Sequence, residues 1–130
     1  MKTTPSVLGV NLHGFFYFTR LAVAEMVKQG SGHVVNITAS LVDNAIVGVP
    51  SVLAALTKGG LNAATKSLAI EFAARGIRAN AVAPGIMKTP MHAPETHAAL
   101  GKLHPVGRMG EISDIVDAVL YLEDGQLRHR

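Results

Sequence analysis

Cysteine is absent from the 130-residue chain, which excludes disulfide bonds and thiol chemistry and is compatible with a cytoplasmic protein. Charge is also scarce, because charged residues make up 16% of the sequence whereas apolar residues make up 48%. A small soluble monomer must keep much of its surface wet. The composition therefore indicates either apolar faces covered by a partner chain or a chain that is part of a larger domain.

Basic stripes are missing as well. The formal net charge is +3, but the lysines and arginines are scattered apart from the "RHR" at the end, with no interleaved aromatics. We therefore expect no nucleic-acid partner. No apolar run approaches the ~20 residues that a bilayer requires, and the N-terminal "MKTTPSVLGVNLHGFF" lacks the pattern of a signal peptide. The expectation is a cytoplasmic location without a membrane span.

The spacing of apolar residues predicts three helices and two strands. Helices are expected over residues 6–29, 51–75 and 111–122, where apolar residues recur at helical spacing. The short apolar stretches at 33–38 and 77–83 are typical of buried strands. This alternation indicates an α/β fold with a parallel sheet covered on both faces. Two strands alone would leave open edges and an uncovered core, so neighbouring strands are expected to be missing.

Four stretches carry a resemblance to a known family. They are "VNLHGFF" (10–16), "GHVVNITAS" (32–40), "LTKGGLNAATKSLAIEFAARGIRANAVAPGIMKTPM" (56–91) and "HPVGRMGEISDIVDAVLYL" (104–122). In this order and spacing they resemble the second half of a short-chain dehydrogenase/reductase. The resemblance implies a Rossmann-type doubly wound parallel sheet and NAD or NADP as the cofactor. It also implies hydride transfer to or from a small-molecule carbonyl/alcohol substrate.

The family's glycine-rich turn, which binds the dinucleotide pyrophosphate, has no counterpart, because no GxxxGxG pattern occurs. The ending "YLEDGQLRHR" also breaks off before the family's last strand. By this resemblance, residues 1–130 are expected to form a single partial domain, about the last half of the fold. It would lack the glycine-rich nucleotide-binding half and the final strand.

Two residues match catalytic positions of the family. Asn11 matches the asparagine whose helix distortion holds a water in the proton relay. Lys58 matches the lysine that binds the nicotinamide ribose hydroxyls and lowers the pKa of the catalytic tyrosine. A nearby ammonium stabilises a phenolate by Coulomb attraction, so this chemistry needs the two groups one helical turn apart. Without the resemblance, both residues would be ordinary polar residues on a helix.

Further matches lie at the cofactor. Pro84 and Gly85 match the turn that faces the nicotinamide. Met87 sits where a backbone amide contacts the carboxamide, and Thr89 matches a hydroxyl that also binds it. Arg78 and Asn80, in contrast, match a pair with a structural role.

The polar stretch 88–105 matches the substrate-covering lid of the family, and it could hold a short helix. It contains three histidines, His92, His97 and His104. Their spacings suit no single helical face, so no metal site is predicted, and we interpret them as solvated lid residues.

The main departure from the family concerns the catalytic tyrosine. Its position, four residues before Lys58, holds Ala54, which can neither donate a proton to a carbonyl oxygen nor accept one from an alcohol. General acid–base catalysis typically contributes ~10²–10⁴-fold, so the loss is severe. The two tyrosines present, Tyr17 and Tyr121, have no evident reason to reach Lys58.

A second departure concerns the family serine, whose position falls on Ala39. Thr38 and Ser40 flank this position. We predict that Ser40 takes the role of the serine if the loop shifts by one residue, with Thr38 as the alternative.

Three hypotheses follow. In the first, the chain is a truncated or split reductase that is inactive alone. In the second, it is a non-catalytic interaction protein that dimerises through the helices at 6–29 and 51–75, which match those of the four-helix bundle in family dimers. In the third, it is an active oxidoreductase that uses Ser40, Lys58 and water in place of tyrosine.

Overall fold

The computed structural model describes residues 4–125. In chain order its elements are α1 (Thr4–Leu8), a π-helical turn (Gly9–Gly14), α2 (Phe15–Gln29), β1 (Gly32–Ile37), a 3-10 turn (Ser40–Val42), α3 (Val52–Phe72), a second 3-10 turn (Ala73–Arg75), β2 (Ile77–Val82), a third (Pro94–Thr96), α4 (His97–Gly101) and α5 (Ile112–Asp124). The predicted helices and strands all form. The first predicted helix is interrupted, however, by the π-helical turn.

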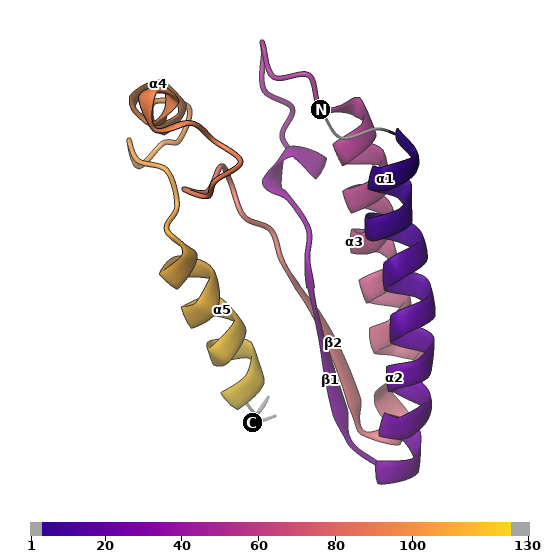
Figure 1. Ribbon diagram of the computed structural model, residues 1–130. Coiled ribbons are helices and arrows are strands. Elements are labelled where there is room, and N and C mark those ends of the chain that lie inside the picture. The colour runs from indigo at the N-terminus through magenta and orange to yellow at the C-terminus, as the bar shows by residue number, and fades with distance from the viewer. Residues whose placement is uncertain (1–3, 126–130) are drawn as a thin grey trace.

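β1 and β2 form a parallel two-stranded sheet, in which Gly32 lies opposite Ile77 and Ile37 lies opposite Val82. In Figure 1, the run from α1 to α2 lies beside α3 on one face of the strands, and α5 lies on the other face. This arrangement confirms the predicted α/β fold with parallel strands between helices.

Two glycines set the common starting point of the strands. Gly30 ends α2 with φ 70°, and Gly76 precedes β2 with φ 74°, a left-handed conformation that glycine adopts without a steric penalty. A Cβ on Gly76 would lie 2.4 Å from the carbonyl oxygen of Gly30. The two helix ends therefore approach so closely that Gly32 N–H can donate to Gly76 O, which places both strands in register.

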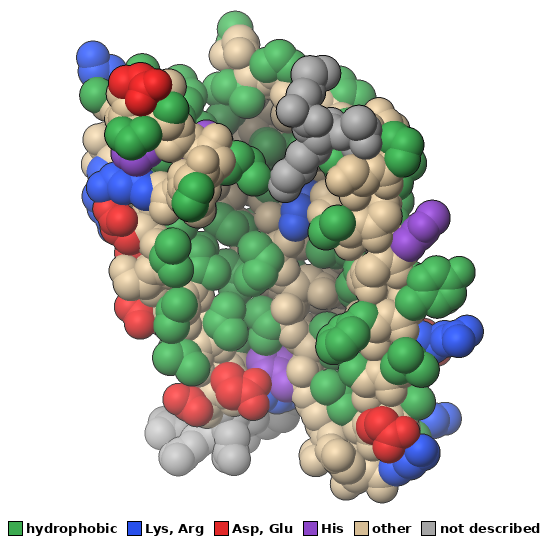
Figure 2. All heavy atoms as spheres, viewed as in Figure 1, with side chains coloured by type: hydrophobic (Ala, Val, Ile, Leu, Met, Phe, Trp, Pro, Cys, Tyr) green, Lys and Arg blue, Asp and Glu red, His purple; other side chains and the backbone are tan. Residues whose placement is uncertain are grey.

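The apolar core of the described residues is small. Its buried side chains are Val23, Leu61, Ile77 and Met109. Large apolar side chains remain exposed on α2, including Phe18 at 75% and Leu21 at 65%. Figure 2 shows further apolar side chains gathered between α5 and the strands. Such exposure exceeds what scattered surface residues explain and is typical of faces that another element covers.

A polar network holds the end of α5 to the strands. Arg78 donates to the carbonyl oxygens of Leu122 (2.7 Å) and Glu123 (3.0 Å). Asn80 Nδ2 donates to His33 Nε2 at 2.9 Å, and His33 Nδ1 donates to Glu123 Oε2 at 2.5 Å. Arg78 thus satisfies backbone carbonyls that the helix end leaves without a partner. These contacts agree with the structural role expected for Arg78 and Asn80.

One edge of β1 is uncovered in the described residues. The N–H groups of Gly32 and Thr38 donate to β2 and its flanks, and parallel strands alternate their hydrogen-bonding direction. The backbone groups of the alternate residues, which are His33, Val35 and Ile37, therefore point away from β2. A groove of about 470 Å³ runs along this edge, and Phe18 and Met26 of α2 line its other side.

The stretch Thr4–Gln29 is long and apolar enough to cross a membrane by length and composition, because an 18-residue window within it has a mean hydropathy of 1.2. Polar and charged residues interrupt the stretch, so it meets the criterion by its average hydropathy and not as an uninterrupted apolar run. Length and composition are weak evidence for a membrane span, since a core helix of a soluble protein passes the same test. In this chain α1 and the π-helical turn contact α3, whereas α2 contacts β1 and contributes Val23 to the core. Only 11% of the apolar window is buried.

Candidate functional site

The π-helical turn places Asn11 against α3. A π-helical turn is rare and frequently lies at functional sites, and here it carries the helix distortion that the resemblance implies at Asn11. Asn11 Nδ2 donates to Thr57 Oγ1 at 3.0 Å, and the Thr57 hydroxyl donates to Leu53 O at 3.0 Å. Thr57 is fully buried. The hydrogen bond from Asn11 holds the π-helical turn against Thr57, the residue that precedes Lys58 on α3.

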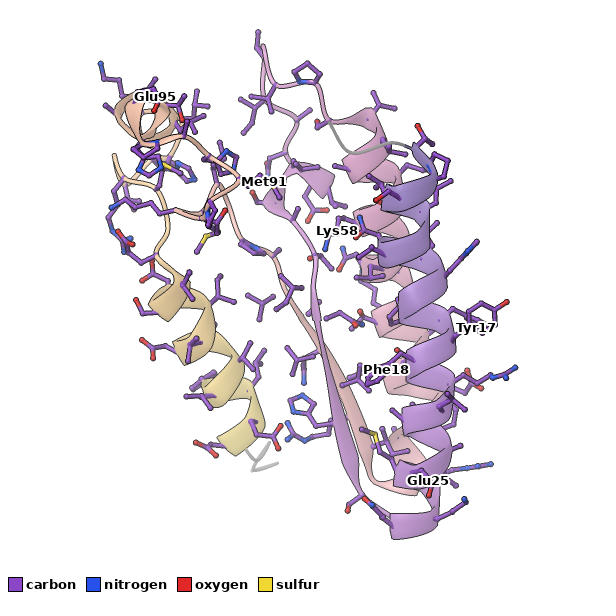
Figure 3. The ribbon with its side chains drawn as sticks, in the orientation of Figure 1. Tyr17, Phe18, Glu25, Lys58, Met91 and Glu95 are labelled. Carbon is purple, nitrogen blue, oxygen red and sulfur yellow. The ribbon has the colours of Figure 1, made fainter. Side chains whose placement is uncertain are left out.

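Lys58 lies at the carboxyl end of β1. Its Nζ donates to the carbonyl oxygen of Ile37, the last residue of that strand, at 2.6 Å. Figure 3 shows the Lys58 side chain pointing from α3 toward the strand. In open α/β sheets, ligands bind outside the carboxyl ends of the strands. The ammonium therefore lies at the end of the sheet where such folds bind ligands, and its contact with a cofactor stays a prediction.

No phenol accompanies this ammonium among the described residues. Ala54 lies one turn before Lys58 on α3, and its methyl side chain has no proton to donate. Tyr17 is 58% exposed on α2 and points away from the sheet (Figure 3), and Tyr121 on α5 is 77% exposed. Neither tyrosine takes the place of the missing one.

Ser40 and Thr38 have different surroundings. Ser40 N–H donates to Pro84 O at 2.9 Å, which brings the loop after β1 against the turn after β2. Thr38 is 4% exposed, and its Oγ1 donates to Val82 O. Because the Thr38 hydroxyl already bonds to the sheet, the Ser40 hydroxyl is the better candidate of the two for the role of the family serine. Its catalytic role stays a prediction.

The turn after β2 is held by the segment before α5. Ile86 O accepts from Gly110 N–H at 3.0 Å, and Lys88 N–H donates to Gly110 O at 2.8 Å. Met87 packs on Gly110 so closely that a Cβ there would meet its sulfur at 2.4 Å. Thr89 Oγ1 accepts from Met91 N–H at 3.4 Å. Residues 84–89 therefore form a defined turn at the same end of the sheet as Lys58 and Ser40.

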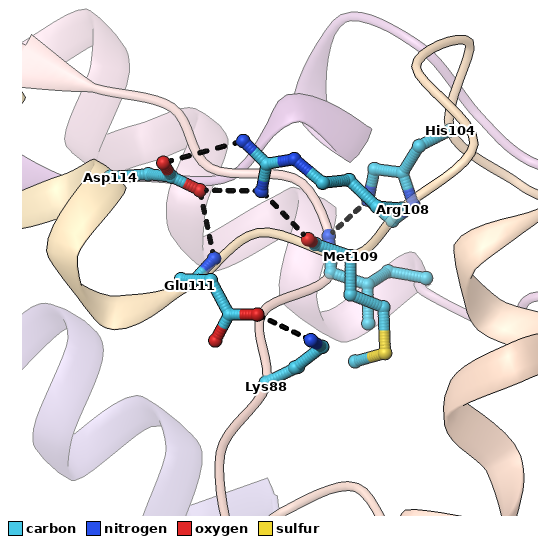
Figure 4. Close-up of polar contacts among 7 residues, drawn as sticks. Lys88, His104, Arg108, Met109, Glu111 and Asp114 are labelled. Carbon is cyan, nitrogen blue, oxygen red and sulfur yellow. Dashed lines mark hydrogen bonds and ion pairs between the residues drawn. The ribbon is translucent and has the colours of Figure 1, made fainter.

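Sequence reasoning missed a charged cluster beside this turn (Figure 4). Arg108 forms an ion pair with Asp114 at 2.9 Å, and Lys88 pairs with Glu111. Asp114 Oδ2 also accepts from Glu111 N–H at 2.9 Å, which caps the start of α5. The hydrogen bond from Arg108 holds the pKa of Asp114 below its usual value. The "EISD" pattern at 111–114 was an available signal, because acidic residues three apart often cap a helix.

His104 corrects the expectation of solvated lid histidines. It is half-buried, its Nε2 accepts from Ile86 N–H at 2.9 Å, and its Nδ1 donates to Leu100 O at 3.1 Å. His97 Nε2 likewise donates to His92 O at 3.0 Å. Within residues 4–125, no group of three or more histidine or acidic side chains could hold a metal ion.

A family model described as enoyl-(acyl carrier protein) reductase matches residues 2–127. The chain belongs to the short-chain dehydrogenase/reductase family, as the sequence predicted.

Among curated relatives, the cyclohexanol dehydrogenase of an Acinetobacter species is 37% identical over 117 residues, covering 89% of this chain and 45% of the relative. The 3-oxoacyl-(acyl-carrier-protein) reductase of Thermotoga maritima is 38% identical over 122 residues, covering 90% and 48%. The chain thus spans about half the length of the curated relatives it matches.

Solved structures agree. ElxO with NADP bound has a TM-score of 0.85 at 27% identity, covering 99% of this chain and 55% of that one. A 3-oxoacyl-(acyl-carrier-protein) reductase from Brucella melitensis with bound NAD has a TM-score of 0.81 at 34% identity, covering 92% and 44%. These neighbours bind NAD or NADP, and the chain matches about half of each.

Proposed function

We propose that this chain is the nicotinamide- and substrate-facing half of an NAD(P)-dependent oxidoreductase that acts on carbonyl or alcohol groups. The observation that carries the proposal is the convergence of Lys58, Ser40 and the turn at 84–89 at the carboxyl ends of β1 and β2. The chain turns over no substrate by itself, because the groove along the β1 edge and the exposed face of α2 belong to an interface with the other half of the domain.

The residues present suit the nicotinamide end of a dinucleotide. When bound, the nicotinamide supplies or accepts the hydride. Lys58 would bind the ribose hydroxyls, and Pro84 and Gly85 would form the wall against the ring. Met87 N–H donates to no acceptor within the described residues, so it is left to donate to the carboxamide together with the Thr89 hydroxyl.

Proton transfer is the weaker part of the site. Ala54 offers no titratable group, so Ser40 and Lys58 are the proton-bearing side chains near the reacting end. Asn11 in its π-helical turn would hold the relay water. In one variant of this proposal the enzyme is active without tyrosine and uses Ser40, Lys58 and water. The hydrogen bond from Ser40 N–H to Pro84 O supports this variant, because it holds the loop of Ser40 against the turn after β2.

A second candidate function is a non-catalytic interaction protein. The observation in its favour is a groove of about 410 Å³ between α2 and α3, lined by Phe15, Phe16, Arg20 and Phe72 among others. In this proposal a second copy of the chain covers the groove, and the chain forms a homo-oligomer through α2 and α3.

Cofactor titration distinguishes these functions. Calorimetry with NADPH and NADH should detect no binding to the 130-residue chain, because nothing in the described residues forms a pyrophosphate site. A version extended with the glycine-rich half of a relative should bind one of the cofactors. Lys58→Ala should weaken that binding, whereas Lys66→Ala, at an exposed lysine two turns further along α3, should not. A micromolar dissociation constant for the short chain, or no binding by the extended one, contradicts the proposal.

A further inference from the structure

We propose that His104 is a positioning residue that couples the lid segment, residues 88–105, to the turn at 84–87. In its effect on cofactor binding this inference rests on the proposed function. The coupling itself rests only on the contacts of His104, Ile86 and Gly85.

The His104 ring makes two hydrogen bonds that define its tautomer. Nδ1 donates to Leu100 O, in the last turn of α4, at 3.1 Å, and Nε2 accepts from Ile86 N–H at 2.9 Å. A neutral imidazole offers one donor and one acceptor, and both are used here. Figure 4 shows the second of these bonds beside Met109 and Arg108. The ring therefore links the lid helix α4 directly to the turn.

Gly85 makes room for this ring. A Cβ built on Gly85 would lie 2.6 Å from His104 Nε2 and 2.9 Å from its Cδ2, closer than real side chains approach. The backbone of Gly85 is therefore in contact with the imidazole. Only a residue without a side chain at this position lets the ring reach the amide of Ile86.

Ile86 is held through both of its peptide units. Its N–H is bound by His104, and its carbonyl oxygen accepts from Gly110 N–H at 3.0 Å. In a trans peptide the carbonyl of one residue and the N–H of the next point in opposite directions. Because Ile86 O points at Gly110, Met87 N–H points away from it. His104 and Gly110 together thus set the direction of the Met87 donor.

Within the described residues, the bond from Ile86 to His104 is the one hydrogen bond that joins the lid segment to residues 84–87. Order in the lid and order in the turn are therefore linked. A ligand that binds the ordered turn should also order the lid, and the effect must be reciprocal because it is a coupling free energy.

Amide hydrogen exchange on the chain as it exists tests the coupling without any cofactor. His104→Leu removes the acceptor and should raise the exchange rate of the Ile86 amide about fivefold to tenfold, as expected for the loss of one hydrogen bond. His104→Gln keeps an acceptor at the end of the side chain and should restore most of the protection. His97→Leu is the matched control, because the His97 ring bonds to His92 O inside the lid.

Gly85→Ala tests the same contact from the other side. Its methyl group should displace the imidazole while leaving His104 intact, and should raise exchange at Ile86 to the same extent. The double variant should be no worse than either single variant. Unchanged exchange in His104→Leu, or equal effects in His97→Leu, would overturn the proposal, as would full additivity of Gly85→Ala and His104→Leu.

A cofactor experiment in the extended protein tests the consequence. NADPH or NADH should protect the amides of residues 97–104 in the parent protein, and this protection should disappear in His104→Leu, an effect that a purely structural role would not produce. Protection that persists in His104→Leu overturns the coupling. If the parent binds neither cofactor, the proposed function fails, and the exchange results in the short chain still decide whether His104 couples the two segments.

Discussion

The residue one helical turn before Lys58 differs from the tyrosine that the family motif predicts there. The Lys58 ammonium donates to Ile37 O, and the residue one turn earlier is Ala54. A phenol at that position would be stabilised as phenolate by the ammonium. A methyl group provides no such proton donor, so the pair of groups that the resemblance implies for acid–base chemistry is incomplete at this position.

The first prediction concerns Ala54→Tyr. In the short chain it should create no dehydrogenase activity, because orientation of the nicotinamide can be worth ~7–11 kcal/mol of the barrier and only one end of the cofactor site is present. In the extended protein it should raise the rate by ~10²-fold or more. Consumption of NADPH or NADH with a panel of ketones and aldehydes measures both. Ala55→Tyr, one position further around α3, is the matched control.

Two results would count against this account. Activity in the short Ala54→Tyr chain would mean that the second half of the fold suffices. No gain in the extended protein would mean that this lineage does its chemistry without tyrosine.

The second prediction concerns Thr57, which is fully buried and bonds to Asn11. Thr57→Val keeps the shape but leaves the Asn11 amide without its acceptor, so the free energy of unfolding should fall by ~1–3 kcal/mol. Urea denaturation followed by circular dichroism measures the change. Thr57→Ser retains the hydroxyl and should lose much less. Equal losses in both variants would indicate that packing, not the hydrogen bond, matters here.

Motifs predicted which residues lie near the carboxyl ends of the strands, but not the contacts that those residues make. The "TKGG" and "APG" stretches identified Lys58, Pro84 and Gly85, because local sequence fixes the turn and the helix that carry them. The role of His104 depends on a contact with Ile86, 18 residues away. Nothing in the local sequence of His104 specifies that contact, so it was interpreted as a solvated residue.

At the scale of elements, the structure and the predictions differ most in the first helix. Residues 6–29 were predicted as one helix, and apolar spacing cannot show that it contains a π-helical turn at Gly9–Gly14. The distortion coincides with the long-range bond from Asn11 to Thr57. Strands were predicted to within one residue at each end. Gly76 and Pro84 bound the second apolar run, and Gly32 stands at the start of the first.

The third prediction concerns the start of α5. The pKa of Asp114 is lowered mainly by its hydrogen bond with Arg108. A lowered carboxyl pKa contributes stability at pH values above its ordinary value, 3.8, and this contribution is lost as the pH falls through the lowered value. Asp114→Asn should therefore lower the melting temperature at pH 7 and have a smaller effect at pH 3, which is below the ordinary value.

The effect of Asp114→Asn should also shrink in high salt, because Arg108 and Asp114 are partly exposed. Asp117→Asn, one turn further along α5, serves as the control. A loss that is the same at both pH values would show that the charge of Asp114 plays no part in holding the helix.

At the scale of the whole molecule, the two-stranded sheet together with α2, α3 and α5 leaves apolar surface uncovered. The sequence already indicated this, since two buried strands cannot form a complete sheet. What it could not indicate is where the uncovered surface lies. The structure places it along the His33–Val35 edge of β1, with Phe18 on the facing side of the groove, and in the groove between α2 and α3 that contains Phe16.

The fourth prediction is that the isolated chain is oligomeric or prone to aggregation, because these two surfaces expose apolar side chains and an unpaired strand edge. Light scattering combined with thermal melting measures this.

Phe16→Ser and Phe18→Ser, two residues apart on α2 and 59% and 75% exposed, report on the two surfaces separately. If a second copy covers the groove between α2 and α3, Phe16→Ser should dissociate a discrete oligomer. If the β1 edge drives association, Phe18→Ser should reduce the larger species, and adding the glycine-rich half should do the same. A well-dispersed monomer with a cooperative melt would contradict both, because it would mean that these surfaces need no cover.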